Sequence, residues 1–533
     1  MSPPIYLLIP MSGQGTRYRK AGYQQPKPLV PVSGVPMIER LLAHFPERWP
    51  AHFVLAENHR DTGLPALLER LRPTANLSYV PPHTRGPGHA ILTALAAIPD
   101  DAPVLVSYCD YGMIWDSAQF ERFVSETGCD ACLISYRGFH AHYLSPVPYA
   151  YSRLEGERVV EVREKGNFTS DREEEYASAG GYYFRTAALL RESVEHQVAL
   201  DLQLGGELYT SLTVEALLRK RPSAHVRVFE IPGFFQWGTP EDLKTFEYWE
   251  RCFQAFNQAA AARGKVAQVL MPMAGLGSRF AQVTQLPKPL IPVFGRPMYQ
   301  AALDSLPVAE RTVLVALEGF ETQLSRSLVP GVELVALAQT PPGQALSTEA
   351  GLPRLDLGRE VLVTACDHGI VLPAARWAAF RDRPDCDAAI FALQGFPGAA
   401  RRPLAYSYVV PAPGGAPFPL VQCVSLKLNP STDPLQDHVL VGTFWFREGR
   451  ILRQGIDELK RRDLRVNGEL YLDAVFDCLR ELGMRVRMIP LDGYINWGDP
   501  DVLAEALYWQ EVFTGRRIDR RLRHPGVPRH AGD

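Results

Sequence analysis

Short, continuously apolar runs alternate along the chain with segments in which apolar residues recur at helical spacing. The runs at 6–11, 52–57 and 103–108 predict buried strands. The segments 36–45 and 64–71 predict helices, because their apolar residues return every three or four positions. Strands that alternate with helices in this way are typical of βαβ units and a parallel sheet. The pattern therefore predicts an α/β fold.

The pattern occurs twice. The stretch from Ile9 to Met37 reads IPMSGQGTRYRKAGYQQPKPLVPVSGVPM, and the stretch from Met271 to Met298 reads MPMAGLGSRFAQVTQLPKPLIPVFGRPM. The two align at an offset of 262 through the glycines and 261 through Pro-Lys-Pro-Leu. A period of this size is that of a whole domain, and the length of 533 residues also favours two domains. We expect copy 1 at residues 1–264, a partly divergent copy 2 at 265–516, and a basic tail at 517–533.

In each copy the first strand leads into a glycine loop that is followed by two cationic residues. Glycine lets the backbone approach a ligand closely, and loop N–H groups with a following helix N-terminus can face an anion. Arginine and lysine add positive charge that a structural turn does not need. A Walker A loop is absent, and a dinucleotide-binding loop requires a third glycine where Tyr18 and Phe280 stand. The loop predicts a phosphate site made by Gly13, Gly15, Thr16, Arg17 and Lys27 in copy 1 and by Gly275, Gly277, Ser278, Arg279 and Lys288 in copy 2.

An aspartate follows a buried strand in each copy, as Cys109-Asp110 and as Cys366-Asp367. The carboxyl ends of parallel strands are where α/β sheets bind ligands. A carboxylate at this place is costly unless it is paired or binds a metal ion. The alternative is a cap for a following helix. Because the aspartate occurs in both copies, we favour metal ligation.

These motifs resemble the signature of the sugar-phosphate nucleotidyltransferases, also called nucleoside-diphosphate-sugar pyrophosphorylases. The likeness is strongest to members whose loop reads Ile-Pro-Met-Ala-Gly-x-Gly-Ser-Arg-Phe and continues Lys-Ala-Gly-Tyr, a segment that copy 2 lacks. The resemblance implies two tandem Rossmann-like nucleotidyltransferase domains, each a mostly parallel sheet flanked by helices. It implies an enzyme that joins an NTP to a phosphorylated sugar or similar small acceptor, releases pyrophosphate and yields an activated NDP-sugar-type product, often for surface polysaccharide biosynthesis. It also implies Mg²⁺ as cofactor, held by Asp110 and Asp367.

The resemblance assigns further residues to the two substrates. The nucleotide base is expected at Gly88, which we align with Gly343 of copy 2. The residues expected at the acceptor are Glu164, Lys165, Gly180 and Glu207 in copy 1 and Lys427, Gly442 and Glu469 in copy 2. From spacing alone, Glu164 and Lys165 would be a solvated face of a strand; the resemblance gives the lysine the acceptor phosphate.

Copy 2 departs from copy 1 at the acceptor, and both copies depart from the family at the metal. Leu426 replaces Glu164, and Thr443 replaces Gly181 with bulk that can crowd the approach of a sugar. Many family members have a second metal-binding aspartate where this chain has Gln236 and Asn496. An amide is a poorer Mg²⁺ ligand than a carboxylate, so we expect the triphosphate to supply the missing oxygens.

The composition bears on which partners and which cellular compartment to expect. The chain has 59 acidic residues against 56 Lys and Arg, a net charge of −3, so no global basic field argues for nucleic acid. Eight scattered cysteines suit a reduced cytoplasm, and we expect the single Cys-x-x-Cys, Cys129 and Cys132, to pack in a core. No apolar run has the length of a membrane span. We expect a cytoplasmic protein, and the sequence leaves open whether it forms a homo-oligomer.

Several functional alternatives stay open. Copy 2 can be a second active site, a regulatory domain or a structural partner of copy 1. The whole chain can also be a non-catalytic sensor of nucleotides or sugar phosphates. A glycosyltransferase is disfavoured, because its usual Asp-x-Asp is absent from Cys109-Asp110-Tyr111 and from Cys366-Asp367-His368. Neither the base of the NTP nor the acceptor follows from the sequence.

Overall fold

The structure is a computed structural model that describes residues 3–83, 85–144, 149–259, 263–320, 324, 331–466 and 468–515. The chain divides into two units, Met1–Glu247 (unit 1) and Tyr248–Asp533 (unit 2). The division falls inside helix α8 (Pro240–Ala259). The basic tail expected at 517–533 lies outside the described residues.

Within the described residues, unit 1 is built on a nine-stranded sheet. Its central strand β1 pairs in parallel with β4 and β6, and β4 pairs in parallel with β5. Strand β11 lies antiparallel between β6 and β8, and β8 pairs in parallel with β12. The strands are β1 (Tyr6–Met11), β4 (Ala51–Ala56), β5 (Asn76–Val80), β6 (Val104–Ser107), β8 (Ala131–Tyr136), β9 (Tyr151–Glu155), β10 (Arg158–Arg163), β11 (Tyr176–Phe184) and β12 (Val226–Glu230).

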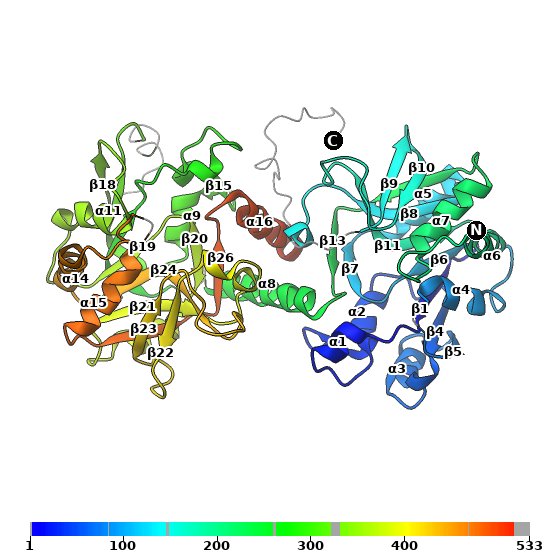
Figure 1. Cartoon of the computed structure of the whole chain (residues 1–533), viewed down its shortest axis with the longest axis horizontal. Helices are drawn as coiled ribbons and strands as arrows, with labels where there is room; N and C mark the ends of the chain where they lie inside the picture. The colour runs from blue at the N-terminus through cyan, green and yellow to red at the C-terminus, as the bar shows by residue number, and fades with distance from the viewer. Residues whose placement is uncertain are drawn as a thin grey trace. The chain divides into compact units, whose positions relative to one another are not determined.

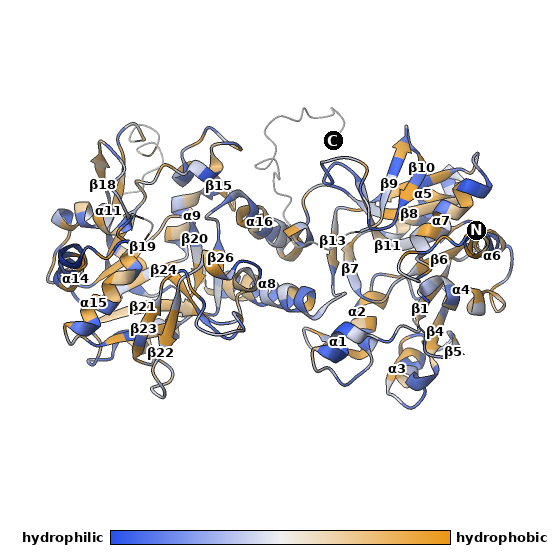
Figure 2. Ribbon diagram, viewed as in Figure 1, coloured by the Kyte–Doolittle hydropathy of each residue, from blue (hydrophilic) through white to orange (hydrophobic). Residues whose placement is uncertain are grey.

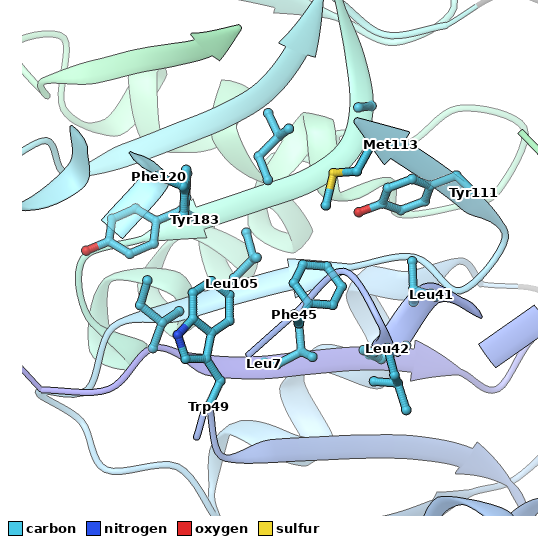
Figure 3. Packing of buried hydrophobic residues seen from close by; sticks show 14 of the residues in the cluster. Leu7, Leu41, Leu42, Phe45, Trp49, Leu105, Tyr111, Met113, Phe120 and Tyr183 are labelled. Carbon is cyan, nitrogen blue, oxygen red and sulfur yellow. The ribbon is translucent and has the colours of Figure 1, made fainter. Parts of the chain in front are cut away.

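Helices cover both faces of this sheet, which explains why β1 is apolar at nearly every position. Leu7 and Ile9 belong to one core cluster, whereas Leu8 belongs to the other, because successive side chains of a strand point to opposite faces. Figure 3 shows the first cluster, where Phe45 and Trp49 pack near Leu7. Helix α4 contacts β1, β4 and β5 on the second face.

The remaining elements of unit 1 are mostly short and surround the sheet (Figure 1). The helices are α1 (Thr16–Lys20), α2 (Met37–Leu42), α3 (Leu64–Leu71), α4 (Pro87–Leu95), α5 (Ser117–Thr127), α6 (Ala187–Ala199) and α7 (Thr210–Lys220), with 3-10 turns η1 (Lys27–Leu29), η2 (Glu57–His59) and η3 (Ala141–Leu144). Two small ribbons pair β2 (Pro31–Val32) with β3 (Val35–Pro36) and β7 (Tyr111–Ile114) with β13 (Gly233–Gln236).

Unit 2 repeats this topology strand for strand. In its described residues the order is β18-β17-β14-β19-β24-β21-β25, with β22 and β23 paired beside β24. The strands are β14 (Lys265–Pro272), β17 (Val308–Leu317), β18 (Val332–Leu337), β19 (Val361–Thr364), β21 (Ala388–Leu393), β22 (Tyr408–Pro411), β23 (Val421–Ser425), β24 (His438–Phe446) and β25 (Val486–Pro490). The predicted α/β fold, with two mostly parallel sheets flanked by helices, is confirmed.

Several of the other elements of unit 2 have counterparts in unit 1, such as η5 for η1 and α9 for α2. The helices are α9 (Met298–Asp304), α11 (Gln344–Gly351), α12 (Ala374–Arg381), α13 (Pro397–Arg401), α14 (Gly449–Arg462), α15 (Val475–Glu481) and α16 (Pro500–Thr514). The 3-10 turns are η4 (Ser278–Phe280), η5 (Lys288–Leu290), η6 (Leu352–Arg354), η7 (Pro403–Ala405) and η8 (Leu472–Ala474). The ribbons pair β15 (Pro292–Val293) with β16 (Arg296–Pro297) and β20 (His368–Val371) with β26 (Gly493–Asn496).

The hydropathy colouring agrees with this burial: the strands of both sheets are largely hydrophobic, whereas helix α14 carries many hydrophilic residues (Figure 2). The expectation that Cys129 and Cys132 pack in a core is confirmed, because both are fully buried in the first cluster. Among the described helices, none has the length and apolar composition needed to cross a bilayer.

Candidate active sites

A cavity of about 730 Å³ in unit 2 gathers the residues expected there. Its size is that of a typical small-molecule site. Apart from Ser278, every residue predicted for copy 2 lines it: Gly275, Gly277, Arg279, Lys288, Gly343, Asp367, Lys427, Gly442 and Glu469, together with Asn496. These residues come from loops that follow β14, β18, β19 and β23, from strands β24 and β26, and from the segment between α14 and η8. The cavity thus lies at the carboxyl ends of the central strands.

Two of the residues that line this cavity form an ion pair. Lys288 Nζ lies 2.6 Å from Asp367 Oδ2, and both side chains are largely buried. Burial would raise the pKa of Asp367, but the Lys288 charge and a hydrogen bond from His368 outweigh it, and the pKa is lowered well below its usual range. Burial would lower the pKa of Lys288, but the Asp367 charge outweighs it and raises that pKa. Both groups are therefore held in their charged forms.

Unit 1 has the same pair in the same place. Lys27 Nζ lies 2.5 Å from Asp110 Oδ2 and donates a hydrogen bond to the carbonyl oxygen of Gly238 at 3.2 Å. In both units the aspartate directly precedes a short strand, β7 or β20, which pairs antiparallel with β13 or β26. The alternative that the aspartate caps a helix is therefore wrong, because a strand follows it.

The glycine loop brings its backbone onto the lysine. Gly15 and Gly277 have φ of +59° and +63°, a left-handed conformation that glycine adopts without strain. A Cβ on Gly277 would lie 2.8 Å from Lys288 Cβ, and one on Gly15 would lie 3.3 Å from Lys27 Cβ. The positive φ and the close approach to the lysine are thus two separate reasons for glycine at this position. The helix expected after the loop is short: α1 has five residues, and unit 2 has only the three-residue turn η4.

The two loop arginines, Arg17 and Arg279, are both exposed. Arg279 lines the cavity of unit 2, and its charge acts on Lys288 and Lys427. Arg17 and Thr16 are exposed at the start of α1, and no described residue forms an ion pair with Arg17. Both arginines are therefore exposed at the start of equivalent short turns, and Arg279 is one of the residues that line the cavity of unit 2.

The alignment of Gly88 with Gly343 is wrong by two residues. Gly343 has φ +122° and precedes α11, and a Cβ there would lie 2.5 Å from Leu470 N. In unit 1 the residue that precedes α4 with positive φ and the same close approach, 2.7 Å to Leu208 N, is Gly86. Gly88 is buried, and its N–H donates to the carbonyl oxygen of Leu208 at 2.9 Å. Its amide is therefore already bonded within the protein.

The two lysines predicted to bind the acceptor share an unusual backbone. Lys165 and Lys427 each have φ +54°, and both follow the corresponding strands β10 and β23. A lysine in the left-handed region is strained, and such strain is concentrated at functional sites. Lys165 Nζ donates to Tyr209 Oη at 2.7 Å, whereas Lys427 Nζ donates to the carbonyl oxygen of Ala405 at 2.7 Å.

Gly180 and Gly442 sit at a β-bulge in equivalent strands. The carbonyl oxygen of Gly180 accepts from Tyr108 N at 3.2 Å, and that of Gly442 accepts from Ala365 N at 3.1 Å. The register of β11 against β8 shifts at Gly180, and that of β24 against β21 shifts near Gly442. Bulges of this kind re-aim a strand beside a binding site.

The expectation that Thr443 crowds the acceptor is wrong. Its side chain is fully buried and does not line the cavity. Thr443 Oγ1 lies 2.7 Å from His368 Nε2 and 2.9 Å from Thr364 Oγ1. Because successive side chains of a strand alternate between faces, the Thr443 side chain points away from the cavity, whereas Gly442 faces it.

The amides that replace the second carboxylate are each held by a tyrosine. Tyr149 Oη donates to Gln236 Oε1, and Asn496 Nδ2 donates to Tyr406 Oη at 3.4 Å. Asn496 Oδ1 also accepts from Gly498 N at 2.8 Å. Both amide oxygens therefore accept hydrogen bonds within the protein, and of the two positions that the family uses for a metal ion, each unit has a carboxylate only at Asp110 or Asp367.

The residues present fit Mg²⁺ in the mode that needs one protein carboxylate. A Cβ on Gly238 would lie 3.5 Å from Asp110 Oδ2, and a Cβ on Gly498 would lie 3.4 Å from Asp367 Oδ2, so glycine keeps space open beside each carboxylate. Among the described residues no group of three or more His, Cys, Asp or Glu could form a metal cage. Mg²⁺ is commonly bound by one or two carboxylates together with substrate phosphates, which is the set available here.

Sequence reasoning missed several residues of the cavity in unit 2. Arg402 lines it and pairs with Asp499 at 3.2 Å. Tyr406 and Asp473 also line it. No motif in the sequence marked these residues. Comparison of each position with its counterpart in copy 1 could have found Asp473, which stands two residues after the shared Gly-Glu-Leu-Tyr segment, where copy 1 has Ser211.

Comparison with known families gives one match that covers more than half of the chain. The model described as "MobA-like NTP transferase domain" matches residues 7–167 and 269–413. The two matched segments begin in β1 and in β14, the equivalent strands of the two units.

Curated relatives match over shorter stretches. The bifunctional protein GlmU of Xanthomonas campestris pv. campestris (strain B100) is 33% identical over 115 residues, 21% of this chain and 24% of GlmU. GlmU of Sphingopyxis alaskensis is 30% identical over 171 residues, 32% of this chain and 36% of GlmU. The chain thus spans about a quarter to a third of the length of the relatives it matches.

Similar solved structures each cover about half of the chain. An inositol-1-phosphate CTP transferase from T. maritima has a TM-score of 0.38 and 17% identity, and the match covers 47% of this chain and 98% of that one. A nucleoside-diphosphate-sugar pyrophosphorylase from Vibrio cholerae RC9 has a TM-score of 0.35 and 18% identity, and the match covers 45% and 99%.

Proposed function

Because the chain belongs to the family of MobA-like NTP transferase domains, we propose that it joins an NTP to a phosphorylated small acceptor and releases pyrophosphate. The family match confirms the expected class, a nucleotidyltransferase. The finer parts of the proposal are that the acceptor is a sugar phosphate or a similar compound, and that the activated product serves surface polysaccharide biosynthesis.

One observation carries the proposal: each unit holds a lysine and an aspartate in contact beside a glycine loop, at the carboxyl end of its central strands. A buried or half-buried pair of this kind adds little to stability, because the desolvation of two charges offsets their attraction. Its repetition, with the loop glycines folded over both lysines, favours a role in binding.

The reaction needs positioning and charge neutralisation more than covalent help from the protein. A phosphate oxygen of the acceptor attacks the α-phosphorus of the NTP, a new P–O bond forms, and the bond to the β-phosphate breaks. The bonding electrons leave with pyrophosphate, so charge grows on the leaving group. Lys27 and Lys288 are the cations that would meet this charge, and Arg279 adds a second cation in unit 2.

In this proposal, substrate binding has to break the contact between the lysine and the aspartate. Without ligands, Lys27 neutralises Asp110 and Lys288 neutralises Asp367. With the triphosphate bound, the lysine would donate to phosphate oxygens, and the aspartate would be free to hold Mg²⁺. When bound, Mg²⁺ neutralises triphosphate charge. The pair thus keeps both groups charged and in place until the NTP arrives.

The acceptor end is assigned by the same correspondence. Lys165 and Lys427 would hold the acceptor phosphate, since both are kept in a strained backbone that presents the side chain beside the site. Gly180 and Gly442, at the bulges, would let the acceptor approach the backbone. Glu207 and Glu469 precede the leucines that contact the glycine at the start of α4 or α11.

The proposal is tested by identifying the donor and then the acceptor. Melting of the full chain is first measured with Mg²⁺ and each of ATP, CTP, GTP, UTP and dTTP, because a bound ligand raises the melting temperature by mass action. The stabilising NTP is then combined with a panel of hexose 1-phosphates, polyol phosphates and inositol phosphates, and pyrophosphate release is followed. Release with at least one acceptor supports the proposal; stabilisation by no NTP and release with no pair would refute it.

A further inference from the structure

The acceptor ends of the two units differ by the exchange of one carboxylate. In unit 1, Glu164 lies just beyond β10, and Ser211 Oγ, near the start of α7, donates to its Oε2 at 2.6 Å. In unit 2 the residue at the place of Glu164 is Leu426, and the residue at the place of Ser211 is Asp473. The loss of the first carboxylate thus coincides with a new one at the position of its hydrogen-bond partner.

Asp473 occupies the wall of the cavity. It lies in η8, is 8% exposed and lines the cavity together with Lys427. Burial raises its pKa, while the Ser407 hydroxyl and the Lys427 charge lower it. In unit 1, burial likewise raises the pKa of Glu164, and the Ser211 hydrogen bond and the Lys165 charge lower it. The two carboxylates therefore have matching surroundings, each beside the lysine with positive φ.

Leu426, which stands at the place of Glu164, has a packing role in unit 2. Its side chain packs against the hydrophobic core of unit 2, so the former carboxylate position has become part of the core. A new buried carboxylate is costly unless it is paired or used. A site that is losing its function is not expected to gain a buried carboxylate in the wall of its cavity. The lysine with positive φ is also present in both units, with the same φ.

We propose that Asp473 is the acceptor-binding carboxylate of unit 2 and that it accepts a hydrogen bond from a hydroxyl of a sugar or polyol phosphate. This inference rests on the proposed function. Asp473 reaches the acceptor from the helix side of the cavity, whereas Glu164 reaches it from the strand side. Unit 2 is therefore a working site whose acceptor presents its hydroxyl differently from the acceptor of unit 1.

The test uses the full chain with unit 1 silenced by Asp110→Asn. Pyrophosphate release from the stabilising NTP is measured with hexose 1-phosphates, inositol 1-phosphate and glycerol 3-phosphate, before and after Asp473→Asn. The KM for the acceptor should rise about 10- to 100-fold, as expected for a lost hydrogen bond to a charged group, while the KM for the NTP stays within about twofold. Asp463→Asn, at an exposed aspartate outside the cavity, is the matched control.

A second variant separates binding from a structural role. Asp473→Ser with Leu426→Glu rebuilds the arrangement of unit 1 and should recover acceptor affinity, with a preference shifted toward the acceptor of unit 1. An unchanged acceptor KM in Asp473→Asn overturns the proposal, as does equal loss of NTP and acceptor affinity. Loss of all turnover in the Asp110→Asn chain, when the unmodified chain is active, also overturns it and leaves the proposed function standing.

If no NTP stabilises the unmodified chain and no pyrophosphate is released, the proposed function is refuted, and acceptor binding then tests the role of Asp473 directly. The same phosphorylated acceptors are then titrated calorimetrically onto the full chain. Binding that Asp473→Asn weakens about tenfold or more, with Asp463→Asn unaffected, supports the role of Asp473. Binding that Asp473→Asn leaves unchanged, or no binding at all, overturns it.

Discussion

Replacing Lys27 by methionine removes the ammonium group from its pair with Asp110 and keeps a side chain of similar length. Lys27 Nζ contacts Asp110 Oδ2 at 2.5 Å and the carbonyl oxygen of Gly238 at 3.2 Å, and the lysine side chain is 20% exposed. In the reaction the same ammonium would face the departing pyrophosphate. Removal of one preorganised donor at developing charge typically costs about 2.7–4 kcal/mol. We therefore expect kcat at unit 1 to fall about 10²- to 10³-fold.

The same substitution should have an opposite effect on metal binding. In the ligand-free chain Lys27 neutralises Asp110, so Mg²⁺ alone competes with an internal cation. Without the ammonium, Asp110 is an unpaired carboxylate, and Mg²⁺ should bind more tightly. Because both side chains are partly exposed and solvent screens the pair, we expect a gain of only about tenfold. A loss of turnover together with a gain in Mg²⁺ affinity distinguishes this account from general damage to the fold.

The assay combines two measurements on a chain in which unit 2 is silenced by Asp367→Asn. Pyrophosphate release reports turnover, and calorimetric titration of Mg²⁺ without nucleotide reports the affinity of the carboxylate. Lys220→Met is the matched control, because Lys220 is exposed and pairs with Glu192 away from the site. Turnover of Lys27→Met equal to that of the control would refute the assigned role, and so would a weaker affinity for Mg²⁺.

Other substitutions test features outside this pair. Gly343→Ala should destabilise unit 2 by at least about 1–3 kcal/mol, because φ is +122° and the new Cβ would lie 2.4 Å from Leu470 O; an unchanged urea midpoint would contradict this. Burial lowers the pKa of His44 to about 4, so only the unfolded chain takes up this proton as pH falls below about 6.5. Stability is therefore lost between about pH 6.5 and 4, and His44→Gln should reduce that loss in melting curves; equal acid sensitivity would count against the argument. Arg401→Met should cost about 3–5 kcal/mol, since it leaves Glu505, which is 2% exposed, without its cation; thermal unfolding would show this, and a cost below about 1 kcal/mol would exclude it.

Much of the fold follows from local sequence. The strand at 6–11 and the helix at 64–71 coincide with β1 and α3, because a fully buried strand and an amphipathic helix leave clear apolar patterns. The helix expected over 36–45 is shorter, Met37–Leu42, since 3-10-like turns follow it. The duplicated motif predicted two equivalent sheets, and the strand orders agree with that prediction.

The errors and omissions concern partners that are distant in sequence. Residue type alone pairs Gly343 with Gly88, whereas the requirement for glycine at Gly343 comes from Leu470, more than 100 residues later. The size of Thr443 predicts crowding of the acceptor, but the alternation of side chains along the strand turns Thr443 away from the cavity. The ion pair of Lys27 with Asp110 joins residues that are 83 positions apart, so no local sequence pattern predicts it.

The most direct test of two nucleotidyl-transfer sites is pyrophosphate release by four forms of the full chain: unmodified, Asp110→Asn, Asp367→Asn and the double variant. Asparagine keeps the shape of the side chain and removes the charge that pairs with lysine and would hold Mg²⁺. We predict that each single variant retains the activity of the other unit, with its own acceptor preference, and that the double variant loses at least about 10³-fold in turnover. A double variant that turns over at the rate of the unmodified chain would contradict the account.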